Sequence, residues 1–169
     1  MANDFPSPTN PLASRTEVFT TYLDFFRTSV VERVKSLSER EQRQSRLATG
    51  WTPLELVKHL NFVERRWLEW GFEGLDVADP WGDRRDERWY VDASESSEEV
   101  LATLLGQGVR SREIIESSAL EDVGQPSERW DGASPPTLER VLFHLLQEYA
   151  RHLGHLDIVV EIADGGTGE

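Results

Sequence analysis

Two histidines and a carboxylate stand close together near the C-terminal end of the chain, in the segment EYARHLGHLD. Glu148 and His152 are four residues apart, so on a helix their side chains lie one turn apart and can reach a common ion. His155 follows one turn later, and His144 precedes Glu148 by one turn. Carboxylates and imidazoles bind divalent metals, and imidazole also transfers protons near neutral pH. The segment therefore indicates a metal site or an acid–base site.

These side chains belong to a long amphipathic helix. The pattern begins after Thr137, the expected N-cap, and is expected to stop at Gly165 and Gly166. At 100° per residue, one face collects Val141, His144, Leu145, Glu148, His152, His155, Leu156 and Val159. The ends of this stripe are apolar and its middle is polar. Because an unpaired buried carboxylate is costly, Glu148 must be paired, hydrogen-bonded or bound to a metal.

A second helix carries the fourth histidine. Thr52 and Glu55 form a capping box around Pro53, and the helix is expected to end near Gly71 or Gly74. Its apolar stripe contains Leu56, His59, Val63, Trp67 and Trp70. A single histidine thus interrupts this stripe as well.

If the two helices face each other, His59 meets Glu148 and His152. Two histidines and one carboxylate are a ligand set of catalytic zinc, with water in the open position. Iron(II), nickel or manganese would also fit such a set. The alternative is that the polar residues form a hydrogen-bonded core network without metal, since a lone histidine on an apolar face is commonly structural.

The remaining pattern predicts an all-α four-helix bundle. One further helix runs from about Ser14 to Leu37, and another begins at a capping box of Ser96 and Glu99. No segment shows the alternation of a strand. Bundle cores commonly hold metal sites because facing helices converge there. The expected limits are a flexible tail over 1–14, the bundle over 15–163 with an irregular insertion at 75–92, and a tail over 164–169.

Composition excludes several function classes. The net charge is −13, from 31 acidic and 18 basic residues, which argues against nucleic-acid binding. There is no cysteine, so disulfides, thiolate ligands and a cysteine nucleophile are excluded. No apolar run is long enough for a membrane span, and the N-terminal segment lacks the apolar core of a signal peptide. A cytoplasmic location is expected.

Both helices resemble those of the DinB superfamily. WTPLELVKHLNFVERRW resembles its second helix and EYARHLGHLDIVVE its fourth, and the likeness extends over about 15–163. The nearest branch is a group of actinobacterial proteins related to mycothiol-dependent isomerases and transferases. The resemblance implies His59 and His152 as metal ligands. Many members have histidine at position 148; the glutamate here also occurs in the mycothiol-dependent isomerases.

The resemblance also implies a function. A divalent metal, zinc first, would bind a low-molecular-weight thiol such as mycothiol or bacillithiol and present it as a nucleophile to an electrophile. His155 would line the pocket and assist proton transfer, whereas His144 would be structural. Arg66 is a candidate for holding an anionic group, unless it is a solvated partner of Glu64 or Glu69. The resemblance further suggests a homodimer.

The insertion would fold over the open end of the bundle, with Trp81, Trp89 and Tyr90 lining a ligand pocket or simply packing.

Two functions of different classes follow for the site. One is a metal-dependent thiol S-transferase or related detoxification enzyme. The other is a non-catalytic metal-binding or stress-associated protein with a structural or vestigial site. A metal-dependent hydrolase is a weaker third, because Glu148 would be used as a ligand and no other general base is evident.

Overall fold

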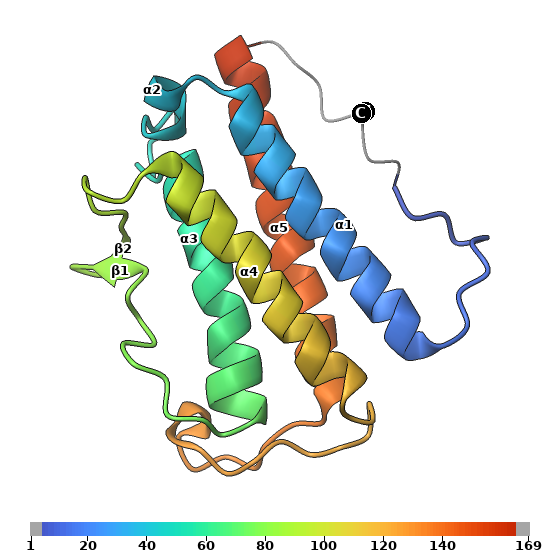
Figure 1. Cartoon of the computed structure of the whole chain (residues 1–169). Coiled ribbons are helices and arrows are strands. Elements are labelled where there is room, and N and C mark those ends of the chain that lie inside the picture. The colour runs from blue at the N-terminus through green and yellow to red at the C-terminus, as the bar shows by residue number, and fades with distance from the viewer. Residues whose placement is uncertain (1–4, 165–169) are drawn as a thin grey trace.

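Four long helices lie side by side in the computed structural model, which describes residues 5–164 (Figure 1). They are α1 (Arg15–Ser36), α3 (Pro53–Glu64), α4 (Ser97–Glu116) and α5 (Leu138–Asp164). The predicted all-α bundle is confirmed. The expected helix end at Gly165 and Gly166, and residues 165–169 of the predicted C-terminal tail, lie outside the described residues.

The helix starts follow the sequence signals. Thr52 accepts a hydrogen bond from the backbone N–H of Glu55, and the Glu55 side chain accepts one from Thr52 N–H. Ser96 and Glu99 form the same capping box at the start of α4. Each box satisfies two backbone donors that the first turn would otherwise leave free. The fourth helix, α5, begins directly after Thr137.

The second predicted helix is an α-helix only in its first part. After Glu64 the helical path continues without a break into η1 (Arg65–Phe72), which is a π-helix. Its wider turn is visible where Glu73 N–H donates to the carbonyl of Leu68, five residues earlier, at 2.8 Å. Extended π-helices are rare and are frequently found at functional sites. Two short helices also appear in the connections, α2 (Glu39–Gln42) and η2 (Glu128–Trp130).

The insertion contains a small hairpin, so the expectation of no strand was wrong there. Strands β1 (Arg84–Arg85) and β2 (Arg88–Trp89) pair antiparallel and lie alongside α3 (Figure 1). The two turn residues, Asp86 and Glu87, both have positive φ values of 51° and 63°. Two consecutive left-handed residues form the tight turn that suits a two-residue hairpin. Strands this short leave no alternation to detect in the sequence.

The core lies between the four helices and is mostly aliphatic. Leu54, Leu60, Leu104, Leu142 and Leu145 are each fully buried. The region before α1 is irregular, and there the ring of Phe5 packs on Phe25 with centroids 4.7 Å apart. No helix within the described residues is long and apolar enough to cross a membrane.

Candidate metal centre between α3 and α5

Three side chains named from the sequence converge between α3 and α5. His59, Glu148 and His152 each offer one ligand atom, and these atoms lie within 4.8 Å of one another. The two imidazole rings have centroids 5.1 Å apart. Both histidines are buried, and Glu148 is partly exposed. One ion can therefore be reached by all three side chains.

The carboxylate of Glu148 is held by two histidines. Its Oε2 lies 3.1 Å from Nε2 of His152, and its Oε1 lies 3.2 Å from Nε2 of His144. The hydrogen bond from His144, followed by that from His152, places the pKa of Glu148 well below its ordinary value. Glu148 is thus ionised at neutral pH, as a metal ligand must be.

His59 is oriented by a carboxylate from the insertion. Its Nδ1 lies 2.9 Å from Oδ2 of Asp83, whose side chain is fully buried. Burial lowers the pKa of His59, and the hydrogen bond to Asp83 offsets this only in part, so the ring is neutral at pH 7. Burial raises the pKa of Asp83, but the hydrogen bonds from His59 and Arg66 outweigh it and the net shift is downward. A neutral ring that donates from Nδ1 keeps Nε2 free to bind a metal.

Arg66 holds the carboxylate of Asp83 in place. Its guanidinium donates to Oδ1 of Asp83 at 2.7 Å and to Oδ2 at 3.1 Å, and to the carbonyl of Pro80 at 3.0 Å. The side chain is buried, so it is neither a solvated partner of Glu64 nor one of Glu69. With its donors directed at the insertion, Arg66 acts on the site through Asp83, and a direct contact with an anionic ligand is disfavoured.

The insertion brings one of its three predicted aromatic residues to the centre. The indole of Trp89 stacks on the ring of His59, with centroids 4.2 Å apart and an angle of 20° between the planes. Trp81 lies instead against Trp70, at 6.4 Å, and the ring of Tyr90 lies 3.7 Å from the guanidinium carbon of Arg85. The hairpin therefore covers the centre with Trp89 alone of these three.

His155 stands at the edge of the centre. Its ring centroid is 5.7 Å from that of His152 and 6.5 Å from that of Trp51. Burial, followed by the neighbouring His152 and Arg151, lowers its pKa below the ordinary histidine value. A neutral imidazole at this position can accept a proton at pH 7.

The residues present fit a divalent cation. Nδ1 of His152 is buried and finds no hydrogen-bond partner among residues 5–164. The other nitrogen of this ring, Nε2, lies 3.1 Å from Oε2 of Glu148, so these two atoms are close enough to bind the same ion. Two imidazoles and an ionised carboxylate are a donor set used by zinc and by iron(II).

Two contributors were absent from the sequence-based site, Asp83 and Trp51. Asp83 lies 24 residues from His59 in a segment without periodicity, and several other acidic residues surround it. The only available signal was general: a metal-binding histidine usually donates its second nitrogen to a carboxylate. That rule predicts a carboxylate partner but does not say which one.

Comparison with known families agrees with this geometry. A family model described as mycothiol-S-transferase matches residues 18–165. The chain belongs to the mycothiol-S-transferase family. This family is DinB-like, so the resemblance noted in the sequence is confirmed.

A solved structure supports the fold. The conserved protein of locus from Enterococcus faecalis superposes with a TM-score of 0.60 at 14% identity, over 90% of this chain and 99% of that chain. At this identity the likeness concerns the fold alone. A search of curated proteins finds no match.

Proposed function

We propose that this protein is a metal-dependent S-transferase that joins a low-molecular-weight thiol of the mycothiol type to an electrophile. The observation that carries the proposal is the convergence of His59, Glu148 and His152 between α3 and α5, in a chain of the mycothiol-S-transferase family. The absence of cysteine agrees with it, since the reacting sulfur must then come from a small molecule.

The three ligands would hold a divalent metal, zinc first. When bound, such a cation favours thiolate over thiol and so supplies a nucleophile at neutral pH. In the reaction a carbon–sulfur bond forms, the bond from that carbon to its leaving group breaks, and the leaving group departs with the bonding pair. The thiol proton is released to an acceptor, for which His155 is placed at the edge of the centre. Asp83 keeps His59 in the tautomer whose Nε2 can bind metal.

Elemental analysis of the purified protein tests the site. Wild type, expressed with zinc, iron, nickel and manganese available, is expected to hold about one metal ion per chain. His59→Ala and Glu148→Gln should lose it, whereas Glu161→Gln, on an exposed position of the same helix, should keep it. Wild type without metal even after reconstitution would contradict the proposal.

Turnover then separates the two functions considered for the site. The metal-loaded protein is incubated with mycothiol or bacillithiol and an aromatic electrophile such as chlorodinitrobenzene, and the thioether is quantified. Product formation that His59→Ala abolishes supports the S-transferase. Tightly bound metal without any thioether, across thiols and electrophiles, would instead support a metal-binding protein.

A further inference from the structure

The candidate metal centre lies in the middle of a longer line of contacts between α3 and α5. At one end the ring of Trp51 lies 6.5 Å from that of His155, and at the other end Trp67 lies 4.2 Å from His144. The pair formed by His59 and His152 stands between them, at 5.1 Å. Residue numbers rise along α3 and η1 while they fall along α5, so the helices are antiparallel. The three pairs lie in order along the interface between them.

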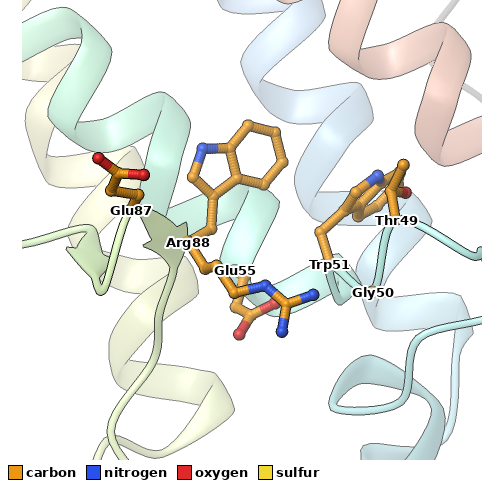
Figure 2. A pocket seen from close by; sticks show the side chains of 7 residues that line it. Thr49, Gly50, Trp51, Glu55, Glu87 and Arg88 are labelled. Carbon is orange, nitrogen blue, oxygen red and sulfur yellow. The ribbon is translucent and has the colours of Figure 1, made fainter.

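A cavity of about 300 Å³ opens at the Trp51 end of this interface. Trp51 and Trp89 form two of its walls, and Trp89 also stacks on His59. Figure 2 shows Arg88 reaching from the hairpin toward Glu55 and Gly50. The walls of this cavity are thus two indoles with charged hydrogen-bonding groups between them.

The guanidinium of Arg88 is available for a ligand. It forms no ion pair with any residue in the described range 5–164, although the carboxylates of Glu55 and Glu87 line the same cavity. Its Nη2 lies 3.2 Å from the position that a Cβ on Gly50 would take, so glycine leaves the space that this side chain uses. Glu55 is already committed, since its carboxylate caps α3 by accepting from Thr52 N–H at 2.8 Å. Arg88 is therefore a cationic donor of this cavity that has no partner among the described residues.

A second cavity, of about 500 Å³, opens at the Trp67 end. Its walls include the aromatic rings of Phe19, Trp67 and Phe143, and the polar side chains of Glu139, Arg140 and Gln147 also line it. Phe143 is 59% exposed, so its ring is accessible from solvent at this cavity. His144 is a further wall, and its Nε2 lies 3.2 Å from Oε1 of Glu148. One wall residue of this cavity, His144, is thus in contact with a candidate ligand of the centre.

We propose that these two cavities divide the two substrates of the reaction. The cavity at Arg88 binds the hydrophilic, oxygen-bearing body of the thiol, and the cavity at Phe143 and Trp67 binds an apolar, aromatic electrophile. This inference rests on the proposed S-transferase function. Its physical basis is the contrast between the walls: a guanidinium recognises acceptor oxygens, whereas apolar walls gain from releasing water around an apolar ligand. Each cavity has one wall residue in contact with a candidate ligand: Trp89 stacks on His59, and His144 lies beside Glu148.

Binding of unreactive probes to the metal-loaded protein tests the apolar cavity. In 1,3-dinitrobenzene neither nitro group is activated for displacement, so the compound serves as an unreactive probe whose binding can be followed by calorimetry. Phe143→Ser is expected to weaken its binding roughly five- to tenfold. The matched control is Ile158→Ser, because Ile158 is 53% exposed on the same helix but lies outside the cavity; it should leave the affinity unchanged. Equal affinities of wild type and Phe143→Ser would overturn the assignment.

The polar cavity is tested with S-methyl mycothiol, in which the sulfur is blocked. Arg88→Ala should weaken its binding about tenfold and leave dinitrobenzene binding unchanged. Arg85→Ala, on the partner strand of the same hairpin and outside the cavity, is the control. A loss of both probes, or of neither, in Arg88→Ala would overturn the division.

These measurements do not depend on turnover. If the protein binds both probes at the expected positions but never forms a thioether, the proposed S-transferase function fails while the two binding cavities stand. If thioether forms but Phe143→Ser and Arg88→Ala both bind the probes as wild type does, the function stands and the division of the cavities fails.

Discussion

Two polar clusters join the same pair of helices, α3 and α5, and they are built differently. The first, here called the core network, consists of Arg27, Glu64, Ser111 and Tyr149, one residue from each of the four long helices. The second, here called the histidine site, consists of His59, Glu148 and His152. Both interrupt an apolar interior, yet they differ in how completely their polar atoms are partnered.

In the core network the carboxylate of Glu64 collects donors from three helices. Nε of Arg27 donates to its Oε1 at 2.9 Å, and the hydroxyls of Tyr149 and Ser111 also donate to it. Nη1 of Arg27 donates to Asp24 at 2.7 Å. A buried ion pair whose polar atoms are all hydrogen-bonded fixes the alignment of the helices that contribute to it. Removing one partner leaves the other charge buried without compensation.

In the histidine site the partnering is incomplete. His152 keeps a buried nitrogen that no group in the described part of the chain satisfies. The comparison teaches that burial of polar residues does not by itself indicate function. A complete network positions the helices, whereas a cluster with an open donor set is suited to bind something from outside.

Removing the charge of Glu64 should produce the largest effect. Glu64→Gln leaves Arg27 charged and buried with only the more exposed Asp24 as its ion-pair partner, so the free energy of unfolding should fall by about 3–5 kcal/mol. Glu148→Gln in metal-free protein should cost about 1 kcal/mol or less, because that carboxylate is partly exposed. Urea denaturation measures both. Similar losses in the two variants would remove the distinction between the clusters.

Asp83→Asn tests how the histidine site is supported. The substitution removes the charge that Arg66 pairs with and that holds the His59 tautomer, so zinc affinity should fall about 10- to 100-fold. Competition with a chromophoric chelator measures the affinity, and ¹⁵N NMR of the metal-free protein reports the tautomer of His59. Asp86→Asn, in the exposed hairpin turn, is the control. Unchanged affinity and tautomer would show that Asp83 is dispensable.

Substitutions at two glycines of α4 distinguish the effect of helix propensity on stability from the effect of side-chain packing. A Cβ on Gly108 would lie 2.5 Å from Cδ of Arg27, whereas a Cβ on Gly106 would meet nothing within 4 Å among the described residues. Gly108→Ala should therefore displace Arg27 from the core network and destabilise the protein by about 1–3 kcal/mol. Gly106→Ala should stabilise it by about 0.5–1 kcal/mol. Thermal and urea unfolding measure both; a stabilised Gly108→Ala would contradict this account of the network.

The core network should also give a pH dependence at the alkaline end. Burial, followed by the charge of Glu64, raises the pKa of Tyr149 well above its ordinary value. Below about pH 10 both folded and unfolded states keep this proton, so stability does not change. Above it the unfolded state releases the proton and the folded state retains it, so stability falls by up to about 1.4 kcal/mol per pH unit. Unfolding of wild type and Tyr149→Phe at several pH values measures this; the variant should lose that part of the slope.

The sequence was sufficient to predict the four long helices and three side chains of the site. Capping boxes at Thr52 and Ser96 set two helix starts, because they satisfy local backbone donors. Polar interruptions of two apolar stripes singled out His59, Glu148 and His152, and the structure brings their ligand atoms within 4.8 Å. Binding of a metal there remains a prediction. These signals are local or periodic, so a sequence carries them without knowledge of the fold.

The tertiary structure decided which residues support the histidine site and which residues hold the four helices together. The choice of Asp83 as partner of His59, and the commitment of Arg66 to Asp83, depend on how an irregular insertion folds back on α3. The role of Glu64 depends on donors that arrive from three other helices. No periodicity links such residues, because their contacts come from packing between distant segments and not from the geometry of one helix.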